Sequence, residues 1–150
     1  MRILPILILL FTLISCTEKA PNEAENLLNE IRADYEAGRY QKALMGIDSL
    51  RHAYPTAVNE RKEALKIHQE ASLKMAQDNL AQVDQALQAA EKSYDSLAIV
   101  VEVNRKALTA TPQMLQQFNE LRVLRDSLRT VFTVECAKIK YIHKRQEQVK

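Results

Sequence analysis

The side chains with the most reactive chemistry in this chain are its two cysteines, Cys16 and Cys136, and its three histidines. Cys136 lies in an apolar stretch of predicted helix, so we expect it to be a small buried hydrophobic residue rather than a nucleophile. A catalytic thiol needs a nearby base, and His143 lies too far along the same helix to serve. No metal or cofactor site is predicted, because none of the histidines joins cysteines and carboxylates in a ligand spacing: His52, His68 and His143.

Residues 1–16 have the pattern of a targeting segment. Arg2 supplies a positive charge, and the apolar run 3–14 that follows is too short to span a bilayer comfortably. The run ends in Leu13-Ile14-Ser15-Cys16, which resembles the bacterial lipobox. The resemblance implies cleavage before Cys16 and acylation of its thiol and its new amino terminus, which together give a stable membrane anchor. Two alternatives stay open: an ordinary secretory signal with a chance cysteine, and a short uncleaved anchor.

The same resemblance implies a location. Thr17 follows the cysteine, and the absence of Asp at this position favours sorting to the outer membrane in Gram-negative lipoproteins. We therefore expect attachment to the periplasmic face of the outer membrane, with display on the cell surface as an alternative. On this interpretation residues 1–15 are a signal peptide, 16–22 a lipidated tether and 23–150 a single helical domain.

The composition predicts an all-α fold and argues against two classes of function. The chain has two glycines, four prolines and no tryptophan, and it is rich in good helix formers. Its formal net charge of +2 creates no strong field for nucleic acid, and export through the signal also argues against that partner. No catalytic constellation is visible, so we do not expect an enzyme.

Residues 23–54 are predicted to form a helical hairpin that turns at Gly38. Part of it resembles the second half of a tetratricopeptide repeat: Gly38-Arg39-Tyr40-Gln41-Lys42-Ala43-Leu44, followed by Ile47, Leu50 and Pro55. The resemblance implies that Gly38 makes the turn, that Ala43 lets the helices approach closely and that Pro55 begins the next helix. Ser72 and Lys74 stand where a second repeat would need Gly and an aromatic residue. We therefore expect one repeat-like hairpin and no peptide-binding array, which needs at least three units.

A single long helix is predicted at 56–109, a stretch with no glycine and no further proline. At about 1.5 Å per residue it would be roughly 80 Å long, so it needs a partner along its length. Tyr94 and the polar Asn104 are expected to be structural, with Asn104 fixing the register. The predicted coiled-coil seam recurs at spacings of three and four: Leu73, Ala76, Leu80, Val83, Leu87, Ala90, Tyr94, Leu97, Val101, Asn104 and Leu108.

The partner is predicted to be a returning helix at 112–148, capped by Thr111. The short connection makes the two helices antiparallel, so the second would end near the N-terminal hairpin. With the turn centred near Ala110, Phe118 is expected opposite Val103. The apolar residues of this helix recur at helical spacing: Met114, Leu115, Phe118, Leu121, Leu124, Leu128, Val131, Ile139 and Ile142.

Near the turn the long helix carries more apolar surface than one partner helix covers. Its residues 97–103 are apolar at all but one position, whereas an antiparallel neighbour hides only about a third of the circumference. We therefore predict that the segment 97–118 contacts a second protein or a second copy of this chain. The candidate interaction residues are Ile99, Val100, Val103, Met114 and Leu115.

Charge is distributed unevenly: residues 17–56 are acidic on balance and 122–150 are basic. We expect the basic end to pair with the acidic hairpin or to be solvated, with a surface for an acidic partner as the alternative.

Taken whole, the chain resembles small helical lipoproteins of unknown function common in Bacteroidetes. The leading hypothesis is a membrane-tethered, non-enzymatic interaction or structural protein of the cell envelope. The alternative is a periplasmic helical chaperone or carrier that holds client proteins.

Overall fold

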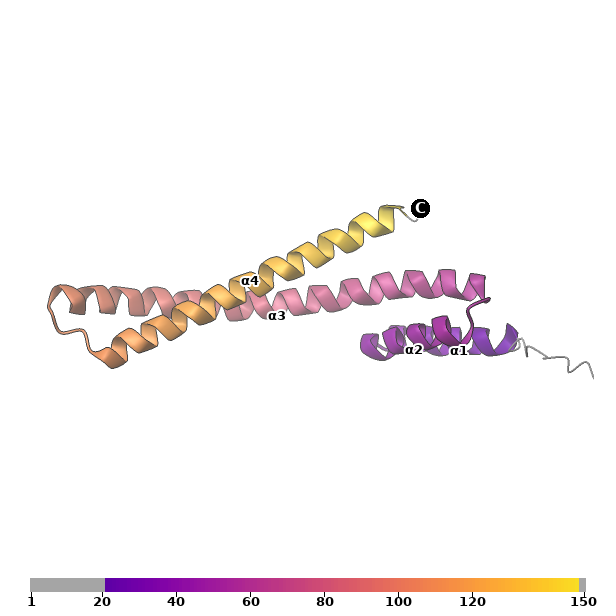
Figure 1. Ribbon diagram of the computed structural model, residues 1–150, viewed down its shortest axis with the longest axis horizontal. Coiled ribbons are helices and arrows are strands. Elements are labelled where there is room, and N and C mark those ends of the chain that lie inside the picture. The colour runs from indigo at the N-terminus through magenta and orange to yellow at the C-terminus, as the bar shows by residue number, and fades with distance from the viewer. Residues whose placement is uncertain (1–20, 149–150) are drawn as a thin grey trace, which may run out of the picture.

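The computed structural model describes residues 21–148, with side chains from Glu23 onward. It contains four helices: α1 (Pro21–Glu36), α2 (Tyr40–Ala53), α3 (Val58–Lys106) and α4 (Pro112–Gln148). No strand occurs in this part of the chain, which confirms the predicted all-α fold. Figure 1 shows α1 and α2 as a short hairpin against one end of α3, and α3 with α4 as a long antiparallel hairpin.

The main core lies where α1, α2 and the first turns of α3 meet. Its buried residues are apolar and come from all three helices: Ala24, Leu28, Ile31, Ala43, Ile47, Leu50 and Ala64. On α2 these residues are spaced by three and four, so they form one face of the helix. A Cβ atom added to Gly46 would lie 2.8 Å from Cγ1 of Ile31. The two helices of the short hairpin are therefore packed too closely there for a larger side chain to fit without movement.

The turn between α1 and α2 depends on Gly38 and Asp34. Gly38 has a φ of +72°, which glycine adopts without steric cost, and the Arg39 N–H donates to the carbonyl of Asp34 at 2.8 Å. The Asp34 carboxylate accepts hydrogen bonds from Arg39 Nε at 2.9 Å and Lys42 Nζ at 3.2 Å. The bond from Arg39 is the main cause that lowers the pKa of Asp34 below its ordinary value of 3.8. A largely buried charge thus joins the end of α1 to the start of α2.

The start of α3 differs slightly from the expectation. Pro55 lies in the turn after α2 and does not begin the next helix, so α3 starts at Val58 rather than at 56. The carbonyl of Pro55 accepts a hydrogen bond from Arg61 Nη1 at 2.6 Å. The side chains of Arg32 and Glu63 form an ion pair that ties α1 to this end of α3.

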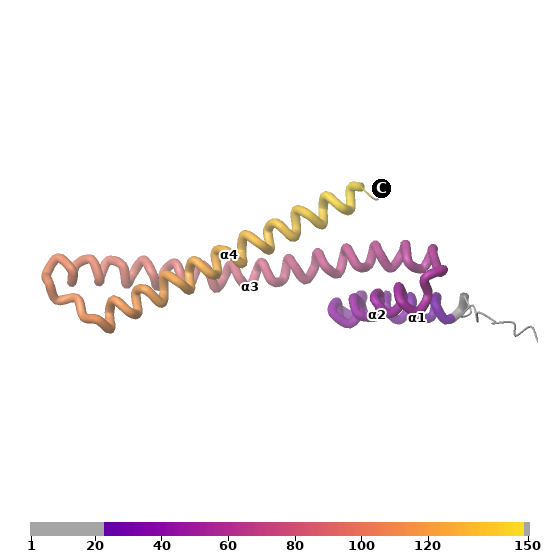
Figure 2. Tube along the Cα trace, in the orientation of Figure 1, coloured from indigo at the N-terminus to yellow at the C-terminus, as the bar shows by residue number. Residues whose placement is uncertain are grey.

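Helix α4 inclines across α3, as ridge-into-groove packing of helices commonly requires. Its C-terminal end therefore lies on the other side of α3 from the short hairpin (Figures 1 and 2). Within residues 21–148, no Cα atom of α4 comes within 8 Å of one in α1 or α2. No ion pair joins the described residues of the basic end to those of the acidic hairpin, so of the two expected outcomes, pairing with the hairpin or solvation, the pairing is not found. Two of the ion pairs in residues 122–148 are internal to α4, Arg125–Asp126 at 2.7 Å and Lys138–Glu135 at 2.6 Å, and a third, Arg129–Glu91, joins α4 to α3.

The predicted seam of α3 is buried or half-buried from Leu73 to Asn104, but Leu108 does not belong to it. Leu108 is 94% exposed, because α3 ends at Lys106 and not at the predicted 109. It has a φ of +57°, and the next N–H, that of Thr109, donates to the carbonyl of Asn104 at 2.8 Å. This is the same helix-ending geometry as at Gly38, here adopted by a residue with a side chain.

The structure corrects three positions on α4. Cys136 is exposed and not buried, and Leu124 and Val131 are also exposed. The buried position is instead held by Glu135, which is 5% exposed and whose Oε2 atom has no hydrogen-bond partner. At about 100° per residue Glu135 lies on the line of Leu128, two turns along. Helix geometry rather than side-chain polarity therefore decides which residue faces the interface.

The antiparallel register agrees with the expectation midway along the long hairpin, where Arg129 Nη2 lies 2.6 Å from Glu91 Oε1. Near the turn it differs. Phe118 stacks on Tyr94, with ring centroids 4.9 Å apart, and does not lie opposite Val103, which is exposed. At about 100° per residue, Val103 lies on the side of α3 opposite the buried Val101 and therefore faces away from α4.

We predict that Ile47→Ala destabilises the protein by about 2–5 kcal/mol, because it leaves a cavity in the fully buried core of the short hairpin. The matched control is Met45→Ala on the same helix, where the side chain is 63% exposed; it should change stability by less than about 0.5 kcal/mol. Urea unfolding followed by circular dichroism measures both. Equal effects of the two substitutions would place the core elsewhere.

We also predict a pH-dependent contribution from Asp34. Because its folded-state pKa is lowered, the stabilisation is fully present above about 3.8, the unfolded value, and is lost as pH falls through the lower folded value. Asp34→Asn removes this contribution. The melting temperature of the wild type should therefore exceed that of the variant at neutral pH, and the difference should shrink in strong acid. A difference that stays constant down to pH 2 would contradict the charge pairing.

Candidate interaction surface at the hairpin tip

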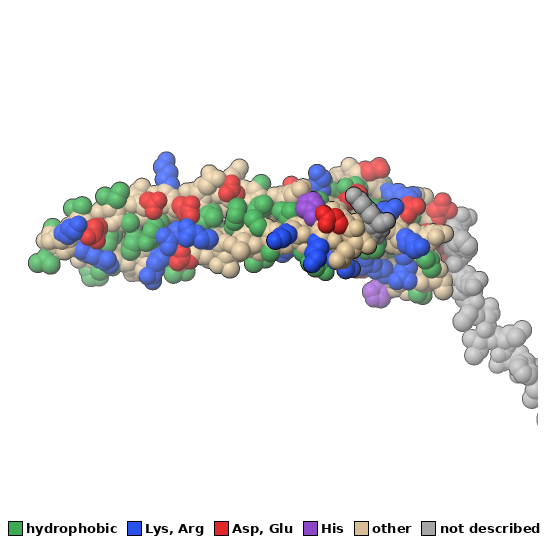
Figure 3. Space-filling view, turned by 90° about the horizontal axis from the view of Figure 1, so that it is seen from above, with side chains coloured by type: hydrophobic (Ala, Val, Ile, Leu, Met, Phe, Trp, Pro, Cys, Tyr) green, Lys and Arg blue, Asp and Glu red, His purple; other side chains and the backbone are tan. Residues whose placement is uncertain are grey.

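The end of the long hairpin carries an exposed apolar surface, here called the tip surface and formed by Ile99, Val100, Val103 and Leu108. The exposed fractions of the first three are 68%, 46% and 61%. At about 100° per residue Ile99 and Val103 lie on the side of α3 opposite Val101, which is 1% exposed, and Val100 lies between the two sides. Figure 3 shows hydrophobic side chains on the molecular surface at this end. The expectation that α4 leaves this side of α3 uncovered is therefore met.

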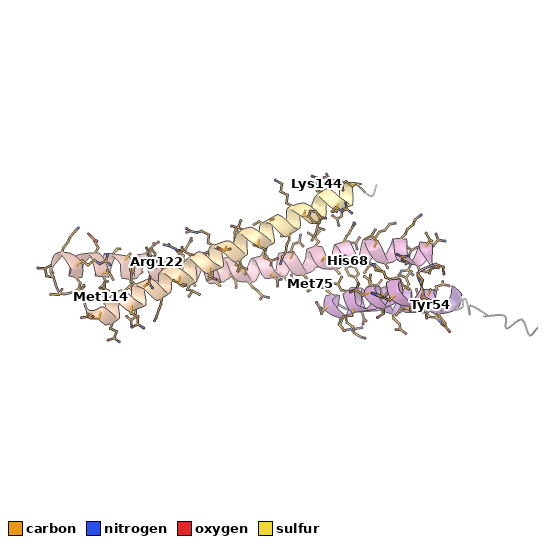
Figure 4. All side chains as sticks on the ribbon, in the orientation of Figure 1. Tyr54, His68, Met75, Met114, Arg122 and Lys144 are labelled. Atoms are coloured by element: carbon orange, nitrogen blue, oxygen red, sulfur yellow. The ribbon has the colours of Figure 1, made fainter. Side chains whose placement is uncertain are left out.

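The two candidate interaction residues on α4 are less exposed to solvent than those on α3. Met114 and Leu115 lie in the first turn of the helix and are half-buried (Met114 is labelled in Figure 4). The free apolar surface at the tip therefore belongs mainly to α3 and to Leu108 in the turn. Sequence reasoning assigned Leu108 to the seam and so missed it as a surface residue.

An aromatic and cationic stack supports the inner side of the tip. The Tyr94 ring stacks on Phe118, and the guanidinium carbon of Arg125 lies 3.9 Å from the centroid of the same ring. Arg125 Nη2 also contacts Asp126 Oδ1 at 2.7 Å, and hydrogen bonding to Asp126 is the main cause that raises the pKa of Arg125. These contacts hold α3 against α4 and involve no residue of the tip surface. Residues of the tip surface can therefore be substituted without loss of these contacts.

The turn is held by polar side chains. Asn104 Nδ2 donates to the carbonyl of Val100 at 2.8 Å, and Asn104 Oδ1 accepts from Thr109 Oγ1 at 2.8 Å. Thr111 Oγ1 accepts from the N–H of Met114 at 3.2 Å, which confirms the predicted cap of α4. Asn104 thus makes local bonds that fix the turn, rather than the contact across the seam expected from its sequence position.

Leu108 is held in a conformation that favours glycine. A left-handed residue with a Cβ atom costs about 1 kcal/mol relative to its right-handed form, and a leucine exposed to water gains nothing from burial to offset this cost. Strained residues of this kind concentrate at functional sites.

The charges around the tip are few and mostly basic. Lys106 Nζ pairs with Glu102 Oε1 at 3.2 Å, and Arg105 is the other charged residue before the turn. The segment 103–119 contains no Asp or Glu. The tip surface is therefore apolar with a weakly cationic border.

A second exposed apolar stripe runs along α4, with exposed fractions from 40% to 63%. Val123, Val134 and Tyr141 lie on one line of the helix, and Leu124 and Val131 flank this line toward the contact with α3. Tyr141 also borders a hollow beside Leu65 and His68 of α3. This stripe was not predicted, because Leu124 and Val131 had been assigned to the interface.

The described residues contain little other reactive chemistry. Within them, no group of three His, Cys, Asp or Glu side chains is placed to hold a metal ion. None of the helices α1 to α4 is long and apolar enough to cross a membrane. Cys16, the predicted lipidation residue, lies outside the described residues.

Comparison with known proteins gives no relative: no protein-family model, no curated protein and no solved structure matches this chain.

Proposed function

We propose that this chain is a lipid-anchored, non-enzymatic protein of the bacterial envelope, attached through Cys16 to the periplasmic face of the outer membrane. Its long hairpin presents the tip surface to a protein partner, either another envelope component or a second copy of itself. The observation that carries the proposal is the exposure of Ile99, Val103 and Leu108 at the end of α3.

The arrangement of the helices supports this role. The first described residue, Pro21, lies at the opposite end of the molecule from the turn between α3 and α4 (Figure 1). Helix α3 has 49 residues, so at about 1.5 Å per residue it separates the two ends by roughly 75 Å. A chain tethered a few residues before Pro21 would therefore hold its tip surface far from the membrane that anchors it.

The size of the tip surface favours a specific but modest contact. Four partly exposed aliphatic side chains offer on the order of 400 Å² of apolar area, less than the roughly 800 Å² that each partner buries in a standard protein interface. Additional contacts are therefore needed, and the partly exposed Met114 and Leu115 are the nearest apolar residues in sequence beyond the turn. Apolar patches of a few hundred Å² on small proteins are commonly binding sites.

The alternative function, a helical chaperone or carrier, is favoured by the stripe on α4. Val123, Val134 and Tyr141 add exposed apolar area along the length of the arm, which suits weak contact with many clients. Photo-crosslinking in intact cells separates the two functions. A dedicated interaction protein gives one dominant crosslinked partner from the tip, whereas a chaperone gives many partners from both surfaces.

We predict that Ile99→Lys weakens the association at the tip without unfolding the protein, because the side chain is 68% exposed. The measurement is the yield of crosslinks from a photoreactive residue at position 103. Met45→Lys, at a similarly exposed apolar residue on α2, is the control and should leave the yield unchanged. Loss of helicity in the Ile99 variant, or full crosslinking by it, would contradict the assignment.

We further predict that Cys16→Ala abolishes labelling by a palmitate analogue and moves the protein out of the washed outer-membrane fraction. The thiol that accepts the first lipid is absent in this variant, and two or more acyl chains are needed for stable anchoring. Label retained on the variant would exclude Cys16 as the acylation site.

A further inference from the structure

A basic groove lies at the opposite end of the molecule from the tip surface, along the first turns of α3. It consists of two adjoining hollows that share Arg51 of α2 and Leu65 of α3. The first, of about 350 Å³, is also lined by Arg61 and Lys62. The second, of about 200 Å³, is bordered by α4 as well and is also lined by His68 and Arg145.

The groove exists because of the way α4 crosses α3. At about 100° per residue, Leu65 and the residues around it continue the side of α3 that faces α4 further along. Helix α4 inclines away from this end, and α1 and α2 pack on another side of α3, against Ala64 and Ile67. An open channel between α2 and α4 is left, with the first turns of α3 as its floor (His68, labelled in Figure 4, lies on this floor).

The charge of this groove is one-sided. Four permanent cations line it, and no carboxylate is among the lining residues of either hollow. Arg51 has one acidic neighbour, Asp48, at 3.5 Å, so one of the four cations is partly offset by a carboxylate outside the lining of the hollows. Within the described residues, neither Lys62 nor Arg145 takes part in an ion pair. Positive side chains that lie close together repel one another in the empty protein. This repulsion is reduced when an anion binds among them.

The titration of His68 agrees with a positive environment. Burial is the main cause that lowers its pKa, the nearby positive charge of Arg51 lowers it further, and the negative charge of Asp48 opposes this shift. His68 is therefore mainly neutral at pH 7 and available as a hydrogen-bond donor or acceptor at the centre of the groove.

We propose that this groove binds a phosphate-bearing anion through Arg51 and Arg145, with Arg61, Lys62 and His68 as further ligands. Arg51 of α2 and Arg145 of α4 line one hollow of about 200 Å³, and arginine is the side chain best suited to planar, bidentate recognition of phosphate oxygens. The site lies beyond the proposed interaction surface and does not depend on it.

The same chemistry has two possible sources. One is a soluble phosphate compound. The other is an anionic lipid headgroup of the anchoring membrane, since Pro21 lies at this end of the molecule and only four residues separate it from Cys16. The lipid source rests on the proposed membrane attachment, whereas the anion site itself does not.

The test uses the full-length lipidated protein in nonionic detergent and follows the thermal midpoint during titration with inorganic pyrophosphate, against sodium chloride of equal ionic strength. A ligand that binds the folded state raises the midpoint saturably. The site variant is Arg51→Gln with Arg145→Gln. The matched control, Arg105→Gln with Arg122→Gln, removes the same charge from the far half of the molecule. We expect the control to behave as wild type and the site variant to bind at least tenfold more weakly.

A second arm places the same three proteins in vesicles of phosphatidylcholine, with or without phosphatidylglycerol. A raised midpoint in the anionic vesicles, absent from the site variant, supports the site and assigns the headgroup as its source. Saturable stabilisation by pyrophosphate alone supports the site with a soluble ligand. No saturable effect in either arm, or equal responses from the site variant and the control, would overturn the proposal. Palmitate labelling of the same samples reports membrane attachment separately, so failure of the anchor and failure of the site are distinguishable.

Discussion

The packing of α3 is the constraint on which the rest of the structure depends. Most of the stability of a helix in water comes from tertiary contacts along an apolar side, and α3 has 49 residues to cover. The chain covers it in two ways. At one end α1 and α2 bury Ala64 and flank Ile67, and along the remainder α4 covers the side that contains Leu87, Ala90 and Val101.

The two ends of α3 differ in how completely their apolar side chains are buried. The three-helix end has a true core, in which Ile31, Ile47 and Leu50 lose nearly all contact with water. The two-helix arm has a thin interface that leaves most of its members half-exposed and encloses the charged Glu135. Two helices alone cannot surround a side chain, so the arm depends on particular contacts such as the stack of Tyr94 on Phe118. Both surfaces of functional interest arise where this cover is incomplete.

The two proposed surfaces differ in chemistry as well as in place. The tip is apolar and has almost no charge to attract an ion, whereas the groove at the other end is lined by arginine and lysine and has no acid of its own. On the proposed attachment through Cys16, the basic groove would lie beside the membrane and the apolar tip roughly 75 Å from it, given the length of α3. A helical rod of this kind keeps two contacts apart at a fixed distance, which a flexible linker of the same length does not.

Much of the fold depends on residues that act on their own backbone or nearest neighbours, so it could be predicted from the sequence. The lack of Gly and Pro set the long helix, Gly38 set the first turn, and Thr111 set the start of α4, because each acts through its own backbone or its nearest neighbours. Only the tertiary structure decided how α4 crosses α3. That angle depends on the fit of many side chains at once, and it exposes Cys136, buries Glu135 and opens the basic groove beside Arg51. The apolar tip was predicted because its surplus of aliphatic residues is a local property. The groove was not, because its arginines lie on different helices and meet only in the folded chain.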